Sequence, residues 1–133
     1  MRIYITHCTD TKKESLKDTG VEVPPDELYT ARWIQRFMKK CKETRVNWAI
    51  FSDLYGVWFP WEEHMWYEMP PNDVSLRQFT NLVADLERKL QDYDEVCFYY
   101  NPGRFHHLYR MLVQVARPRG KKMKLITRFD DIT

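Results

Sequence analysis

The chain has 133 residues, a length that suits one domain with one hydrophobic core. Hydrophobic residues make up 44%, aromatic residues 15% and charged residues 30%, a composition that excludes disorder and collagen-like repeats. The 21 Lys and Arg residues against 19 Asp and Glu residues give a net charge of +2, and the pI near 8.4 is not that of a typical polyanion-binding domain.

Three cysteines, Cys8, Cys41 and Cys97, are spread along the chain without a CxxC pair. Their odd number and wide spacing argue against a disulfide framework and against a cysteine zinc site, so neither a metal nor another cofactor is expected. The N-terminus begins directly with strand-like sequence, and no apolar run approaches the ~20 residues that cross a bilayer. We therefore expect a soluble, cytoplasmic protein with no membrane partner.

Four short apolar runs predict buried strands at residues 3–8, 48–52, 96–100 and 123–127. Each run is continuous rather than alternating, which is typical of a sheet covered on both faces. Between the runs, helical periodicity predicts helices at residues 26–43, 74–91 and 104–117. The order predicts a single α/β domain over residues 1–133. Its architecture is a three-layer sandwich with a four-stranded, mainly parallel sheet, Rossmann-like but without the GxGxxG fingerprint.

Polar residues follow the predicted strands where each strand ends. In an open parallel sheet, ligands bind in the crevice beyond the carboxyl ends of the strands, so these residues are the candidates for binding. Asn101 through Arg104 also precede a predicted helix, whose backbone N–H groups would meet an anion. The candidate ligand-binding residues are Thr9, Asp10, Ser52, Asp53, Tyr55, Gly56, Asn101, Gly103 and Arg104.

Cys8 is the candidate nucleophile. Lys12, four residues further on, would lower the pKa of the thiol, and His7 would serve as a base. In the alternative interpretation, Cys8 is a small apolar residue at the end of a buried strand and Lys12 is solvated. Asp53 also has two interpretations, because it either accepts hydrogen bonds from a base or ribose or caps the following turn.

Two connections, residues 9–25 and 55–71, are longer than the loops of a domain of this size usually are. Six aromatic residues of the second would stack a flat heterocycle, form a homodimer interface or close the domain's own core. They are Tyr55, Trp58, Phe59, Trp61, Trp66 and Tyr67. Residues 117–124 form a basic run that either contacts an RNA or DNA backbone or is a solvated turn.

Short motifs occur along the chain in a recognisable order. They are Cys8-Thr-Asp-Thr-Lys12, Glu27-Leu-Tyr-Thr30, Trp48-Ala-Ile-Phe-Ser-Asp-Leu-Tyr-Gly56 and the segment 100–109. Together they resemble a family of small microbial and viral α/β domains that is similar to the core domain of archaeosine synthase, an enzyme of deazaguanine modification in transfer RNA. The resemblance covers about residues 2–115 and implies reactive roles for Cys8 and Lys12.

The resemblance departs from the enzyme's pattern directly after Lys12. In archaeosine synthase the signature continues with Pro-Tyr and then Ser and His, whereas this chain continues with Lys13-Glu-Ser15. The enzyme's own reaction, addition of an amine to a nitrile on the base, is therefore not carried over as a whole. Only Cys8 and Lys12 match this part of the pattern.

Two functions follow from the sequence. The first is a small α/β protein that binds a purine-like (deazaguanine) base or nucleotide at the carboxyl edge of the sheet. Such a protein would modify the ligand through Cys8, as a transferase- or lyase-type enzyme. The alternative is a non-enzymatic interaction module that binds a protein partner, or a second copy of itself, through the aromatic loop 55–71.

Overall fold

Strands that run in parallel form the centre of the molecule. The computed structural model describes residues 1–101, 106–116 and 122–133. The described strands are β1 (Arg2–His7), β2 (Asn47–Ser52), β3 (Gly56–Trp58), β4 (Glu95–Tyr99) and β5 (Lys122–Ile126). They form one sheet in the order β3-β2-β1-β4-β5. Strands β2, β1, β4 and β5 are parallel, and β3 pairs antiparallel with β2.

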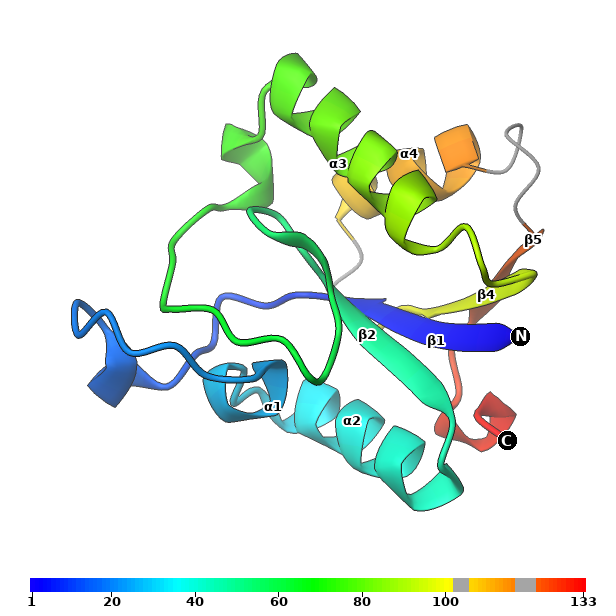
Figure 1. The fold of residues 1–133 in the computed structure, drawn as a ribbon, viewed down its shortest axis with the longest axis horizontal. Coiled ribbons are helices and arrows are strands. Elements are labelled where there is room, and N and C mark those ends of the chain that lie inside the picture. Colours follow the sequence, from blue (N-terminus) through cyan, green and yellow to red (C-terminus); the bar gives the residue numbers. More distant parts are fainter. Residues whose placement is uncertain (102–105, 117–121) are drawn as a thin grey trace.

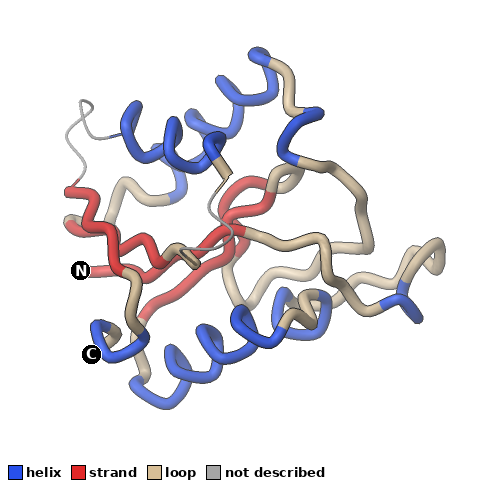
Figure 2. Tube along the Cα trace, turned by 180° about the vertical axis from the view of Figure 1, so that it is seen from behind, coloured by secondary structure: helices blue, strands red, loops and turns tan. Residues whose placement is uncertain are grey.

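Helices cover both faces of this sheet. Figure 1 shows α1 (Pro25–Leu28) and α2 (Arg32–Thr44) on one side, and α3 (Leu76–Lys89) and α4 (His107–Ala116) on the other. The same three layers are visible from behind in Figure 2. Short 3₁₀ helices are η1 (Glu14–Leu16), η2 (Pro71–Asp73) and η4 (Phe129–Asp131). Both β1 and β2 are buried from their second residue onwards, which explains why their sequences are continuous apolar runs.

The sheet has five strands, so the prediction of four is wrong. The additional strand, β3, lies within residues 55–71, which the sequence predicted as a loop. A tight reversal leads into it. The Oγ of Ser52 accepts hydrogen bonds from the backbone N–H groups of Leu54 (3.1 Å) and Tyr55 (3.0 Å), and Gly56 follows with a φ of 73°. Because β3 has only three residues, it is too short to show a hydrophobic period.

A three-residue break divides the helix predicted over residues 26–43 into α1 and α2. Residues 11–13, which follow β1, form backbone hydrogen bonds with the chain at this break. The backbone N–H of Lys13 donates to the carbonyl of Leu28 (2.8 Å). The N–H of Thr30 donates in turn to the carbonyl of Thr11 (3.1 Å). These tertiary bonds hold the break extended, and a helical period in the sequence does not reveal them.

Gly56 and Gly20 offer a matched test of the reversal into β3. Both have a positive φ, 73° and 71°. A Cβ on Gly56 would come within 2.1 Å of Oδ2 of Asp85, whereas a Cβ on Gly20 would meet no atom within 4 Å. The same Oδ2 accepts a hydrogen bond from the N–H of Val57 (2.9 Å), so the clash also disturbs β3.

We expect Gly56→Ala to lower the free energy of unfolding by about 2–4 kcal/mol and Gly20→Ala by about 1 kcal/mol. Gly56→Ala loses more stability because it both strains the backbone and displaces the Asp85 carboxylate. Gly20→Ala only strains the backbone. Urea unfolding of both variants measures the difference. Equal losses would contradict this account of the reversal.

Candidate functional site

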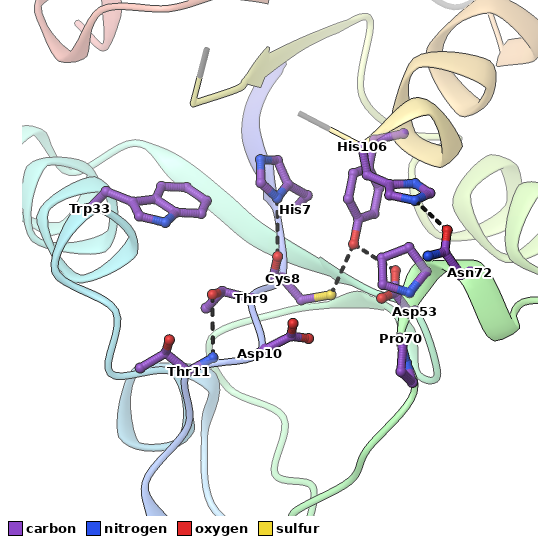
Figure 3. Close-up of a pocket in the computed structure, with 12 residues that line it drawn as sticks. His7, Cys8, Thr9, Asp10, Thr11, Trp33, Asp53, Pro70, Asn72 and His106 are labelled. Atoms are coloured by element: carbon purple, nitrogen blue, oxygen red, sulfur yellow. Dashed lines mark hydrogen bonds between the residues drawn. The ribbon is translucent and has the colours of Figure 1, made fainter. Parts of the chain in front are cut away.

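A pocket of about 520 Å³ opens at the carboxyl ends of β1 and β2 (Figure 3). In the sheet, β1 has β2 as its neighbour on one side and β4 on the other, so the strand order proceeds from β1 in both directions. Chain segments that leave such a point in opposite directions leave a crevice between them. The volume is in the range of small-molecule sites. The pocket is lined by His7, Cys8, Thr9, Asp10, Thr11, Trp33, Asp53, Pro70, Pro71, Asn72, His106 and Tyr109.

His7 ends β1 and forms part of the pocket wall. Its imidazole packs between the rings of Trp33 and Tyr109, with centroid distances of 4.9 and 4.8 Å. Nδ1 lies 3.0 Å from the carbonyl oxygen of Cys8 and, because a carbonyl only accepts, Nδ1 carries the proton and donates it. Burial lowers the pKa of His7 to about 4. At neutral pH the ring is therefore an uncharged aromatic surface and a weak base.

A chain of hydrogen bonds connects Cys8 to Asp53 through Tyr109. The Tyr109 hydroxyl donates to Oδ1 of Asp53 over 2.7 Å, and the Sγ of Cys8 lies 3.4 Å from the same hydroxyl oxygen. Since the only hydroxyl proton of Tyr109 is given to Asp53, the thiol of Cys8 donates to the Tyr109 oxygen. Figure 3 labels Cys8 and Asp53 and marks the two hydrogen bonds of this chain with dashed lines. The arrangement provides a path for a proton from a thiol to a carboxylate.

Burial sets the protonation of both ends of this chain. Burial raises the pKa of Asp53 from 3.8 to about 6, against the hydrogen bond from Tyr109, which favours the ionised form. Burial, reinforced by the negative charge of Asp53, raises the pKa of Cys8 to about 12. This direction is opposite to the lowered thiol pKa that the spacing of Cys8 and Lys12 predicted. At neutral pH Cys8 is therefore a neutral thiol.

The charge of Lys12 acts on Asp53. Lys12 is 8% exposed, and its Nζ lies 4.7 Å from the ring centroid of Tyr67 and 5.8 Å from that of Trp66. It is not part of the pocket wall. Its charge lowers the pKa of Asp53 and so opposes the effect of burial. Lys12 is thus placed to stabilise the ionised carboxylate of Asp53 in the pocket wall.

Three predicted binding residues lie behind the pocket. The hydroxyl of Ser52 holds the reversal before β3, as described above. The Tyr55 hydroxyl donates to the carbonyl of Met65 (3.0 Å), and Gly56 makes the sharp turn beside Asp85. Tyr55 and Gly56 instead line a neighbouring cavity of about 270 Å³.

The remaining predicted residues fall in three places. Thr9 and Asp10 line the pocket beside Cys8. Asn101 lines a separate cavity that adjoins it. Gly103 and Arg104 lie outside the described residues, and so do residues 117–121 of the basic run; the rest of that run belongs to β5.

The aromatic residues of loop 55–71 mostly pack inwards. Trp58 and Tyr67 are buried, and Tyr55, Phe59 and Trp66 are partly buried against the core. Trp61 is the exception, at 71% exposed. This packing agrees with a loop that closes the domain's own core, the last of the three interpretations of the loop.

Several pocket residues were not predicted as site residues from the sequence. Tyr109 belongs to the buried face of α4, where a hydroxyl among apolar residues signals a need for a partner. Trp33, on α2, faces His7, and its Nε1 is buried without a hydrogen-bond partner among the described residues. His106 donates from Nε2 to Oδ1 of Asn72 (2.8 Å). Nothing in the sequence indicates that His106 and Asn72 are hydrogen-bond partners.

Comparison of the chain with protein-family models, with curated proteins and with solved structures finds no match. The resemblance to archaeosine synthase stays a prediction. No group of three or more His, Cys, Asp or Glu side chains in the described chain is placed to hold a metal ion. No helix within the described ranges is both long enough and apolar enough to cross a membrane.

The raised pKa of Asp53 makes a prediction about stability. A carboxyl whose pKa is higher in the folded protein destabilises the fold as it ionises, so the penalty develops between about pH 4 and pH 6 and then stays constant. Asp53→Asn removes the penalty. We expect the free energy of unfolding of this variant, relative to wild type, to increase across that window by on the order of 3 kcal/mol.

Chemical unfolding at pH 4, 5, 6 and 7.5 measures this difference. Asp92→Asn is the matched control, because Asp92 is exposed and lies outside the pocket. A difference for Asp53→Asn that is independent of pH would show that the carboxylate is not held at a raised pKa.

Proposed function

We propose that this chain binds a purine-like base, free or as part of a nucleotide, in a Rossmann-like site at the carboxyl edge of the sheet, and that Cys8 reacts with the bound ring. The observation that carries the proposal is the hydrogen-bonded chain Cys8–Tyr109–Asp53 at the base of a pocket large enough for such a ligand. A thiol held next to a proton acceptor is the arrangement that nucleophilic catalysis requires.

Aromatic surface and polar groups meet in this pocket. Trp33 is the partly exposed member of the aromatic cluster that it forms with His7 and Tyr109, and its ring is the surface on which a flat heterocycle stacks. Asp10 supplies acceptors for ring N–H groups near the mouth of the pocket.

The chemistry at Cys8 follows from the two pKa values. Because the pKa of Cys8 is raised to about 12 and that of Asp53 only to about 6, transfer of the proton before any bond forms is strongly unfavourable. Proton transfer must therefore accompany attack, with Asp53 as the general base acting through Tyr109. When the thiol adds to a nitrile on the base, sulfur bonds to carbon and the proton returns to nitrogen. The addition is balanced without a co-reactant.

The alternative function, an interaction module that uses loop 55–71, has less support from the packing. Most of the aromatic rings of the loop contact the core, which leaves mainly Trp61 for a partner. If Trp61 held a second copy of the chain, Trp61→Ala would reduce the mass measured by light scattering. An unchanged mass would remove self-association through this loop.

Stacking in the pocket leads to a binding prediction. We expect Trp33→Ala to weaken the binding of guanosine, measured by calorimetric titration, by about 10-fold or more, because one base–aromatic stack contributes roughly 1–3 kcal/mol. Trp61→Ala, which removes the same ring from an exposed position outside the pocket, should leave binding unchanged. The absence of binding by guanosine, deazaguanine bases and nucleotides alike would refute the proposed function.

The proton path leads to a second prediction, on the reactivity of Cys8. In alkylation by iodoacetamide the S–C bond forms, iodide leaves and the thiol proton passes through Tyr109 to Asp53. We expect the rate at Cys8 to rise with pH through about 6, as Asp53 ionises. Tyr109→Phe should slow the reaction at pH 7.5 by about 100-fold, a typical contribution of general-base catalysis.

Mass spectrometry of digested protein follows the reaction at each cysteine separately. Cys41, which is buried in α2 and does not line the pocket, is the internal control in every sample. Identical pH profiles for wild type and Tyr109→Phe would mean that Tyr109 does not carry the proton.

A further inference from the structure

A second cavity, of about 480 Å³, adjoins the pocket. It is lined by Thr11, Thr30, Ala31, Arg32, Trp33, Arg36 and Asn101. Thr11 and Trp33 line both cavities, so the two spaces meet along a shared wall. A ligand that stacks on Trp33 in the first cavity can therefore extend past this wall into the second.

Arg32 and Arg36 give the second cavity a positive charge. They lie one turn apart on α2, both are exposed, and no carboxylate of the described residues forms an ion pair with either of them. The guanidinium of Arg36 lies 5.2 Å from the ring centroid of Phe129, which orients it without neutralising it. No acidic residue is among the lining residues. Two guanidinium groups at this spacing suit a phosphate, which accepts hydrogen bonds from several donors at once.

The first pocket has the opposite character. Its described lining contains Asp10 and Asp53 but no lysine or arginine. An anion in this pocket would face two carboxylates, whereas a base with ring N–H donors would be attracted to them. The first pocket thus favours a group that donates hydrogen bonds, and the second cavity favours an anion. The two cavities meet at Trp33.

We propose that the ligand is a nucleotide, with its base in the first pocket and its phosphate between Arg32 and Arg36 in the second cavity. The inference rests on the proposed function and narrows its ligand from a base to a phosphorylated nucleotide. Thr11 and Asn101 add polar groups beside the phosphate. The sugar spans the shared wall.

Calorimetric titration of the full chain with guanosine and with guanosine 5′-monophosphate tests the assignment. At low salt we expect the monophosphate to bind about 10-fold more tightly than guanosine. Arg32→Gln and Arg36→Gln should each remove most of that advantage, and raising the salt concentration should reduce it. Arg77→Gln, the same substitution at an exposed position on α3, should retain it. Guanosine affinity should be the same in all variants, which also shows that each variant is folded.

The outcomes separate the two proposals. If guanosine binds and the monophosphate binds no more tightly, or if the double variant Arg32→Gln/Arg36→Gln keeps the advantage, the phosphate site is overturned and the proposed function stands. If neither ligand binds, the phosphate site is overturned, and if deazaguanine bases do not bind either, the proposed function fails with it. The phosphate can belong to a free nucleotide or to a strand. A trinucleotide with a central guanosine that binds more tightly than the monophosphate assigns it to a strand, and one that binds more weakly assigns it to a free nucleotide.

Discussion

The hydrogen bond from the Tyr109 hydroxyl to the Asp53 carboxylate is the interaction on which the site depends. It joins α4 to the residue that follows β2, two segments that are 56 positions apart in the chain. A buried hydrogen bond to a charged group contributes about 1.5–3 kcal/mol, and losing it removes one of the polar partners of a carboxylate in a poorly solvated place. The bond therefore fixes the position of the Tyr109 ring. That ring packs on His7 and bonds to Cys8, so the wall of the pocket and the surroundings of the thiol both follow from it.

The buried polar groups in and beside the pocket lower the stability of the fold. The hydroxyls of Tyr29 and Tyr67 bond to each other in a fully buried position, and burial raises the pKa of both well above the ordinary value. Lys12 and Asp53 are also nearly removed from solvent. Apolar side chains of similar size would fill this space without the cost of desolvating polar groups. The four polar groups around Cys8 therefore make the fold less stable than an apolar filling of the same space would.

The sequence predicted the parts of the fold that depend on a long, regular pattern. The four parallel strands were visible because strands buried on both faces are continuous apolar runs, and Cys8, Thr9, Asp10 and Asp53 could be placed in the pocket because parallel strands end at one edge. The strand β3 and the break before α2 were missed because they depend on single contacts, the carboxylate of Asp85 and the backbone bonds to residues 11–13. Tyr109 and Trp33 were missed for a related reason. A residue on a buried helix face gives the same periodic signal whether it faces the core or a cavity.

The pKa of His7 is lowered and that of Asp53 is raised, so these two pocket residues affect the stability of the fold in opposite directions as the pH changes. His7 has its pKa lowered from 6.5 to about 4, so the stability that neutral His7 provides is lost as the pH falls through that range. Asp53 has its pKa raised from 3.8 to about 6, so it destabilises the fold as the pH rises through nearly the same range. The two slopes oppose each other, and the cost of the buried carboxylate is largely hidden in the wild-type pH profile. Near pH 5 both side chains are mostly neutral. Above pH 6 the pair carries a single negative charge, on Asp53. In the function that we propose, this charge attracts a ligand rich in N–H donors and accepts the proton of Cys8, so that both steps depend on the same ionisation.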